Sequence, residues 1–140
     1  MATIKNFEDL EIWQNARKLC QNINKYCLLN PKFYQHDKNQ IDRTSASIMD
    51  NIAEGFEREG NKEFVNFLTM SKGSAGEVRS QLIRAKDRNY LDEEIFILEE
   101  KDENKNKYII IESRKKQTYE EFSNKTFVIR IALGYVSGYF

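Results

Sequence analysis

The stretch that decides the fold is QIDRTSASIMDNIAEGFER, Gln40 to Arg58. Its large apolar residues return at intervals of four or seven positions, the spacing of one face of an α-helix. They are Ile41, Ile48, Ile52 and Phe56, with small Ser45, Ala53 and Gly55 near them. This pattern predicts an amphipathic helix over about residues 36–58. The tripeptide Glu59-Gly60-Asn61 that follows is typical of a helix end and turn.

The next segment has the most regular pattern in the chain and predicts a helix over about residues 62–88. Its apolar and small residues alternate steps of four and three: Phe64, Leu68, Ser71, Ala75, Val78, Leu82 and Ala85. Asn61 is the expected N-cap. Gly73 and Gly76 lie inside this helix, where glycine usually admits a close neighbour or loosens the helix.

The segment before the decisive stretch predicts a helix over about residues 9–29. Its apolar face consists of Ile12, Ala16, Leu19, Ile23 and Tyr26. Asp9 is a candidate N-cap. The pair Asn30 and Pro31 ends the helix, because a residue that precedes proline avoids the α conformation.

The last third of the chain is harder to interpret. Glu99 to Lys107 has no apolar residue, which predicts a solvated loop or an exposed helix extension there. Residues 95–116 are expected to form a charged connection. Within this connection, the run Tyr108 to Ile111 could equally form a short strand. From Tyr119 to Phe140 a seam of period three and four returns, which predicts a fourth helix over residues 117–138. The β-branched residues from Val128 to Ile131 argue mildly for a strand there.

Four such seams predict an all-α fold, an antiparallel up-down four-helix bundle with a long irregular connection before the fourth helix. Residues 1–140 are expected to form a single domain. The mean spacing of 3.5 residues indicates gentle left-handed packing of the helices.

Composition excludes some classes of function. Lys plus Arg total 22, Asp plus Glu total 22, and the formal net charge is zero, so bulk positive charge does not attract nucleic acid or membrane. The charge is unevenly distributed, because residues 61–90 carry six basic and three acidic side chains, whereas residues 41–60 carry two and five. The start of the chain lacks the apolar run of a signal peptide, and no run is long enough to span a membrane. We therefore expect a cytoplasmic protein with no membrane partner.

Few residues suit catalysis or metal binding. His36 is the only histidine, and the two cysteines, Cys20 and Cys27, are seven residues apart. On one helix that separation is about 10.5 Å, too far for a disulfide, so buried free thiols are expected. No catalytic triad, metal site or phosphate-binding loop can be assembled from these residues. We expect no enzyme activity, no metal and no cofactor.

A polar stripe runs beside the apolar face of the helix at 36–58. Its members are Gln40, Thr44, Ser47, Asn51, Glu54 and Arg58. Ser47, Asn51, Glu54 and Arg58 are our candidates for a subunit interface or a buried polar network, and the alternative is a solvated flank.

A basic cluster occupies the second half of the helix at 62–88. Lys72, Arg79 and Lys86 recur every seven residues along the edge of the apolar seam, while Arg84 and Arg88 share the outer face. These five residues are the candidate nucleic-acid-binding set, because such a stripe can contact phosphates without reading bases. An ordinary solvated helix face is the alternative.

Three segments resemble one protein family. FEDLEIWQNA (Phe7 to Ala16), the decisive stretch itself and GSAGE (Gly73 to Glu77) are similar to the four-helix bundle proteins encoded in intervening sequences of bacterial 23S ribosomal RNA genes. The accessory proteins of diversity-generating retroelements are more distantly similar. Met49-Asp50 departs from a pair that contains proline in many members, and Glu99 to Lys107 looks inserted.

The resemblance implies a small non-enzymatic protein that assembles as a homo-oligomer, often a pentamer. It also implies a link to ribosomal RNA or another nucleic acid, or to a reverse transcriptase. The leading hypothesis is an oligomeric bundle that binds structured RNA or DNA through basic helix surfaces. The alternative is a protein-interaction scaffold that does not itself bind nucleic acid.

Overall fold

The computed structural model describes residues 4–91, 95–101, 107–113 and 131–132, with side chains described over residues 4–91. Between residues 4 and 91 all of the regular structure is helical, as the sequence predicts. No helix in the described part of the chain is both long and apolar enough to cross a bilayer.

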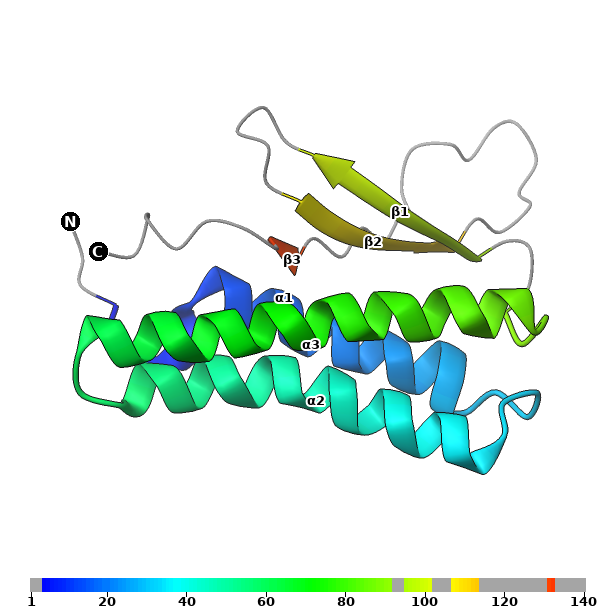
Figure 1. Ribbon diagram of the computed structural model, residues 1–140, viewed down its shortest axis with the longest axis horizontal. Coiled ribbons are helices and arrows are strands. Elements are labelled where there is room, and N and C mark those ends of the chain that lie inside the picture. Colours follow the sequence, from blue (N-terminus) through cyan, green and yellow to red (C-terminus); the bar gives the residue numbers. More distant parts are fainter. Residues whose placement is uncertain (1–3, 92–94, 102–106, 114–130, 133–140) are drawn as a thin grey trace.

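Three successive helices run antiparallel along the long axis of the molecule (Figure 1). Helix α1 spans Glu11–Ile23 and continues as a π-helical turn, η2, over Asn24–Leu28. A 3-10 turn, η1, precedes it at Phe7–Asp9. Helix α2 spans Gln35–Glu57 and α3 spans Asn61–Asp87, close to the ends expected from the sequence. Among the described elements, these two helices make the most extensive contact.

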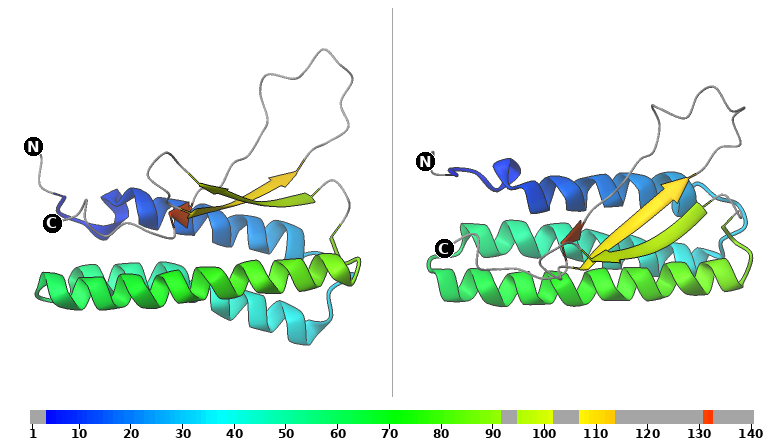
Figure 2. Two further views of the ribbon diagram at one scale, coloured as in Figure 1. Left: turned by 45° about the horizontal axis from the view of Figure 1, so that its top comes forward. Right: turned by 90° about the horizontal axis from the view of Figure 1, so that it is seen from above.

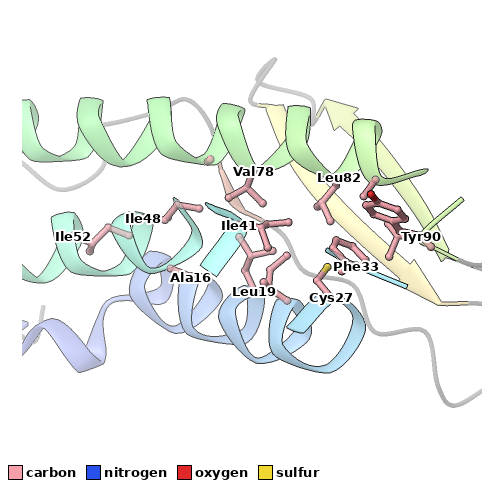
Figure 3. Close-up of a cluster of buried hydrophobic side chains, with 14 of the residues drawn as sticks. Ala16, Leu19, Cys27, Phe33, Ile41, Ile48, Ile52, Val78, Leu82 and Tyr90 are labelled. Atoms are coloured by element: carbon pink, nitrogen blue, oxygen red, sulfur yellow. The ribbon is translucent and has the colours of Figure 1, made fainter. Parts of the chain in front are cut away.

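The core lies where the apolar faces of the three helices meet (Figure 3). The predicted seams supply it, since Leu19 of α1, Ile48 of α2 and Val78 of α3 are completely buried. Burial of side chains of this size stabilises the fold by roughly 1.5–3 kcal/mol each. The other side chains labelled in Figure 3 are Ala16, Cys27, Phe33, Ile41, Ile52, Leu82 and Tyr90, all buried.

The turn after α1 is attached to the far end of α3 through one side chain. Asn30 Nδ2 donates to the carbonyl oxygens of Tyr26 (3.2 Å) and Tyr90 (2.9 Å), and Asn30 Oδ1 accepts from the Lys32 amide (2.9 Å). The expected stop at Asn30-Pro31 is therefore also a contact between segments distant in sequence. The ring of Phe33 packs beside Tyr90, with 5.0 Å between centroids.

At the other end of the molecule two glycines shape the α2–α3 hairpin. Gly60 has φ +103°, a conformation that favours glycine, and precedes the first residue of α3. Gly55 is buried where the helices approach closely. A Cβ atom there would lie 2.5 Å from Phe67 Cβ and 3.0 Å from Phe64 Cδ2. Close packing of α2 against α3 therefore explains why residue 55 is a glycine.

Two expected caps are not the ones that the structure uses. Asp9 lies in η1, and Leu10 is the N-cap of α1, with no side-chain hydrogen bond. Asn61 is the first residue of α3, and Gly60 occupies the N-cap position. The N-cap of α1 is thus one residue later than expected, and the N-cap of α3 is one residue earlier.

The last described residues form a small antiparallel sheet in the order β1-β2-β3. β1 spans Ile95–Lys101 and β2 spans Lys107–Ser113, and their register pairs Ile95 with Ser113 and Lys101 with Lys107. β3 is the pair Ile131–Ala132 beside β2. The sheet lies over α1 and α3, on the side away from α2 (Figures 1 and 2).

This sheet corrects the expectation for the last third of the chain. Residues 95–116, expected as an irregular connection, contain the β1–β2 hairpin. The run Tyr108 to Ile111 follows its β-branched content and pairs with β1. The fourth helix expected at 117–138 lies outside the described residues except for Ile131 and Ala132, which are in a strand. The four-helix bundle is therefore not confirmed.

Glycine-to-alanine substitutions test the close approach of α2 and α3. Gly55→Ala should destabilise the fold by about 1–3 kcal/mol, because the Phe67 backbone must move to make room. Gly73→Ala is the matched control, since nothing lies within 4 Å of its added Cβ, and it should stabilise by up to about 1 kcal/mol. Urea unfolding measures both. Equal effects of the two substitutions would contradict the close approach.

Candidate nucleic-acid interface

The polar stripe predicted on α2 turns its first half toward α3. Thr44 Oγ1 donates to the Gln40 carbonyl oxygen (2.8 Å), so its lone pairs accept from Gln81 Nε2 of α3 (3.0 Å). Gln40 Oε1 accepts from Arg84 Nη2 (2.7 Å). Because arginine can only donate, the orientation of the Gln40 amide is determined. These bonds cross the α2–α3 interface at successive helical turns.

The same interface continues toward the hairpin. Ser47 Oγ and Ser74 Oγ are 3.0 Å apart, and Asn51 Nδ2 donates to the carbonyl oxygen (2.7 Å) and the hydroxyl (3.0 Å) of Ser47. Buried Ser71 Oγ donates to the Ile48 carbonyl oxygen (2.9 Å). We call the cross-helix bonds of Gln40–Arg84, Thr44–Gln81, Ser47–Ser74 and Ile48–Ser71 the polar ladder.

The four candidate residues for a subunit interface or polar network divide into two pairs. Ser47 and Asn51 are part-buried and form hydrogen bonds within the chain. Glu54 and Arg58 form an i,i+4 ion pair of 2.7 Å with both side chains about half exposed. The pKa of the Arg58 guanidinium is raised, first by this hydrogen bond and then by the charge of Glu54. This second pair faces solvent and remains accessible to a partner.

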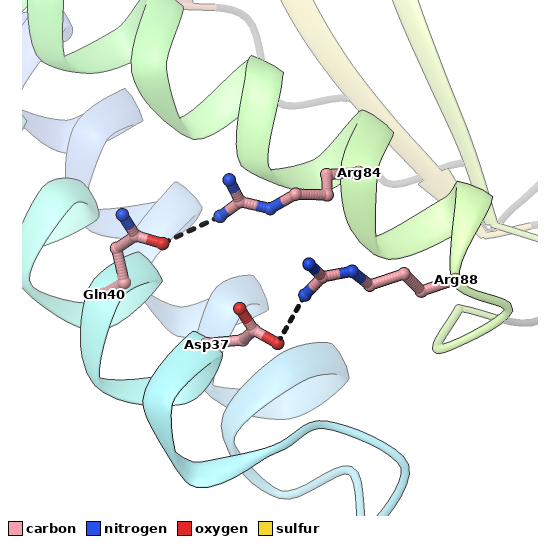
Figure 4. A network of polar contacts seen from close by, with 4 residues as sticks. All are labelled: Asp37, Gln40, Arg84 and Arg88. Atoms are coloured by element: carbon pink, nitrogen blue, oxygen red, sulfur yellow. Dashed lines mark hydrogen bonds and ion pairs between the residues drawn. The ribbon is translucent and has the colours of Figure 1, made fainter.

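The five basic candidates on α3 lie on two different sides of the helix. Arg84 and Arg88 face α2, where Arg88 Nη1 contacts Asp37 Oδ2 at 2.9 Å, next to the bond between Arg84 and Gln40 (Figure 4). The face of α3 that carries these two arginines, expected to point outward, therefore contacts α2. The other three, Lys72, Arg79 and Lys86, follow the opposite flank, since a heptad step nearly repeats the helical angle.

Exposure differs among the basic residues. Lys72 and Lys86 are exposed and Arg79 is half-buried. Arg88 remains 47% exposed although its partner Asp37 is only 12% exposed, and its guanidinium lies 5.9 Å from the centre of the Tyr90 ring. The structure thus brings together two arginines with α2 and leaves a lysine-rich flank on the other side.

Sequence reasoning missed a groove on the outer side of α2. It measures about 350 Å³ and is lined by His36, Asn39, Gln40, Arg43 and Thr44. The spacing of these residues, with His36 and Arg43 seven apart, was a signal that they share a face. The predicted stripe included Gln40 and Thr44 but not the basic pair beside them.

One buried acceptor lies next to the polar ladder. Gln81 Oε1 accepts no hydrogen bond from the described residues, while its Nε2 is committed to Thr44. A cavity of about 10 Å³ lined by Gln81, Asp37, Arg84 and Arg88 adjoins it, roughly the room that one water molecule needs.

The groups that could serve catalysis are few and separated. Among the described residues there is no group of three or more His, Cys, Asp or Glu side chains that could hold a metal ion. Both cysteines are free. Burial raises the pKa of the Cys27 thiol to about 12 and is also the main reason that the pKa of Cys20 is raised. Both thiols are protonated and poorly nucleophilic near neutral pH.

A family model for the 23S rRNA-intervening sequence protein matches residues 8–112, three quarters of the chain. The chain belongs to this family. Comparison with curated proteins and with solved structures finds no match. The match begins in η1 and ends in β2, so it includes α1, α2, α3 and the β1–β2 hairpin. The resemblance noted in the sequence is confirmed.

The buried thiol predicts a loss of stability at alkaline pH. The unfolded thiol ionises near pH 9 and the folded one near 12, so its contribution is intact below pH 9 and lost as pH rises toward 12. Between about pH 8 and about pH 10.5 the native protein should lose roughly 2 kcal/mol more stability than Cys27→Ala. Urea unfolding at both pH values measures this. Equal losses in the two proteins would contradict it.

Proposed function

We propose that this protein is a non-enzymatic, self-associating member of the intervening-sequence family that binds structured RNA through the basic flank of α3. The observation that carries the proposal is the line of Lys72, Arg79 and Lys86 along one side of a long, well-packed helix. Their spacing extends over about 21 Å at a rise of 1.5 Å per residue. A rigid row of cations of this length can follow several phosphates of one RNA strand.

The charge distribution supports binding at a defined surface. The net charge is zero, so the whole molecule is not attracted to RNA indiscriminately. Local attraction requires a surface where basic side chains outnumber acidic ones, and the segment from residue 61 to 90 has twice as many basic as acidic residues. Phosphate contacts of this kind position RNA without reading its sequence.

The choice of test residues follows from the roles of the arginines. Arg84 and Arg88 hold α3 to α2, so reversing their charge would disturb packing as well as RNA binding. Lys72 and Lys86 are exposed and belong to no bond of the polar ladder. A loss of binding by a variant of these two lysines that keeps the helix content and stability of the native protein can be assigned to the surface.

The double variant Lys72→Glu, Lys86→Glu should bind a structured 23S ribosomal RNA fragment at least about tenfold more weakly than the native protein in a gel-shift titration. The slope of log K against log salt should also become shallower, by about two for two lost phosphate contacts. The helix content by circular dichroism should not change.

The matched control is Lys5→Glu, Lys18→Glu, which makes the same change of net charge on exposed residues outside α3. It should bind nearly as tightly as the native protein. Equal weakening in both variants would contradict a specific α3 surface. Absence of salt-dependent RNA binding by the native protein would instead favour the alternative, a scaffold for a protein partner such as a reverse transcriptase.

Self-association is supported by the exposed ion pair of Glu54 and Arg58 and by the pentamers that the family resemblance implies. Light scattering at micromolar concentration should give a multiple of 16.6 kDa, five-fold for a pentamer. The charge-swap variant Glu54→Arg, Arg58→Glu keeps an ion pair within α2 but presents the wrong charges to a neighbouring subunit. It should lower the assembled mass without unfolding the protein. A native monomer of about 17 kDa would overturn the proposal.

A further inference from the structure

The groove on the outer side of α2 is a polar surface that has no role in the RNA binding proposed for the α3 flank. It is lined by His36, Asn39, Gln40, Arg43 and Thr44 and measures about 350 Å³. It belongs to the first half of α2, and Gln40 connects it to Arg84 of α3. The ligand that it suits depends on which of its donors and acceptors already form hydrogen bonds within the protein.

Gln40 offers a donor to the groove. An arginine side chain carries donors only, so the atom of Gln40 that meets Arg84 must be its amide oxygen. The two N–H bonds of Gln40 Nε2 therefore lie on the other end of the amide, away from Arg84, as Figure 4 shows. This orientation is enforced by the fold.

The other groove residues add further donors. Asn39 Oδ1 accepts from Gln35 Nε2 at 2.8 Å, and in this arrangement the Asn39 amide N–H groups can donate to a ligand. Thr44 has its proton committed to the Gln40 carbonyl and its lone pairs to Gln81. Arg43 is exposed and makes no ion pair with any described residue. His36 donates at least one N–H in either protonation state.

No carboxylate is among the described residues that line the groove. Asp37 points to the α3 side and is paired with Arg88. Asp42 immediately precedes Arg43 and lies about 100° from it around the helix axis. A concave surface with several donors, a guanidinium and no acidic lining is suited to an anion with several acceptor oxygens.

We propose that this groove binds a phosphodiester group of the RNA, held by the Arg43 guanidinium and by the amide N–H groups of Gln40 and Asn39. The inference rests on the proposed RNA binding and adds a contact on α2 to the flank of α3. Arg84 positions the donor of Gln40 from behind, so the phosphate site depends on the α2–α3 pairing.

The most selective test is Gln40→Glu. A glutamate keeps an oxygen for Arg84 and turns the contact into an ion pair, so the fold should be at least as stable. It replaces the outward N–H groups by a negative oxygen, which repels phosphate. Binding of the structured 23S ribosomal RNA fragment should weaken by about tenfold, the effect of one charged hydrogen bond.

Gln21→Glu is the matched control, because it makes the same chemical change at an exposed position of α1. A second pair removes a single positive charge, Arg43→Gln in the groove and Lys18→Gln on α1. Each groove variant should bind more weakly than its control. If both pairs are equal while Lys72→Glu, Lys86→Glu still weakens binding, the groove assignment is wrong and the proposed function stands. If the native protein binds no RNA, both fall.

Discussion

The pairing of α2 with α3 is the constraint on which the rest of the structure depends. Apolar seams alone would allow the two helices to slide by a turn, because the seams repeat. The polar ladder removes that freedom, since a shifted register would leave buried Ser71 and Gln81 without their present partners, a cost of about 1–3 kcal/mol each. Gly55 adds a steric condition, because only glycine fits opposite Phe67.

This pairing also divides the polar surface into parts with different roles. Arg84 and Arg88 are the most basic part of the α3 sequence, yet they serve as contacts to Gln40 and Asp37. The flank with Lys72 and the groove with Arg43 are the surfaces that we propose for RNA. Gln40 belongs to both parts, because its oxygen is bonded to Arg84 of α3 and its side chain also lines the groove.

Much of the helical region could be predicted from the sequence, because the periodicities of Leu19, Ile48 and Val78 reflect burial directly. The pairing of Arg84 and Arg88 could not, because it depends on which residues a neighbouring helix brings opposite them. The strand at Tyr108 to Ile111 was ambiguous, since a short apolar run fits either periodicity and the choice depends on a distant partner strand. The groove could not be predicted because the sequence does not show that Arg84 occupies the amide oxygen of Gln40 and leaves its amide nitrogen as a donor.

The most direct test of this account is ultraviolet crosslinking of the protein to the bound 23S ribosomal RNA fragment, with the crosslinked peptides identified by mass spectrometry. The account predicts crosslinks in the segment of α2 that contains His36 to Arg43 and in the segment of α3 from Lys72 to Lys86. Crosslinks confined to α1, with none in either of those two segments, would contradict it.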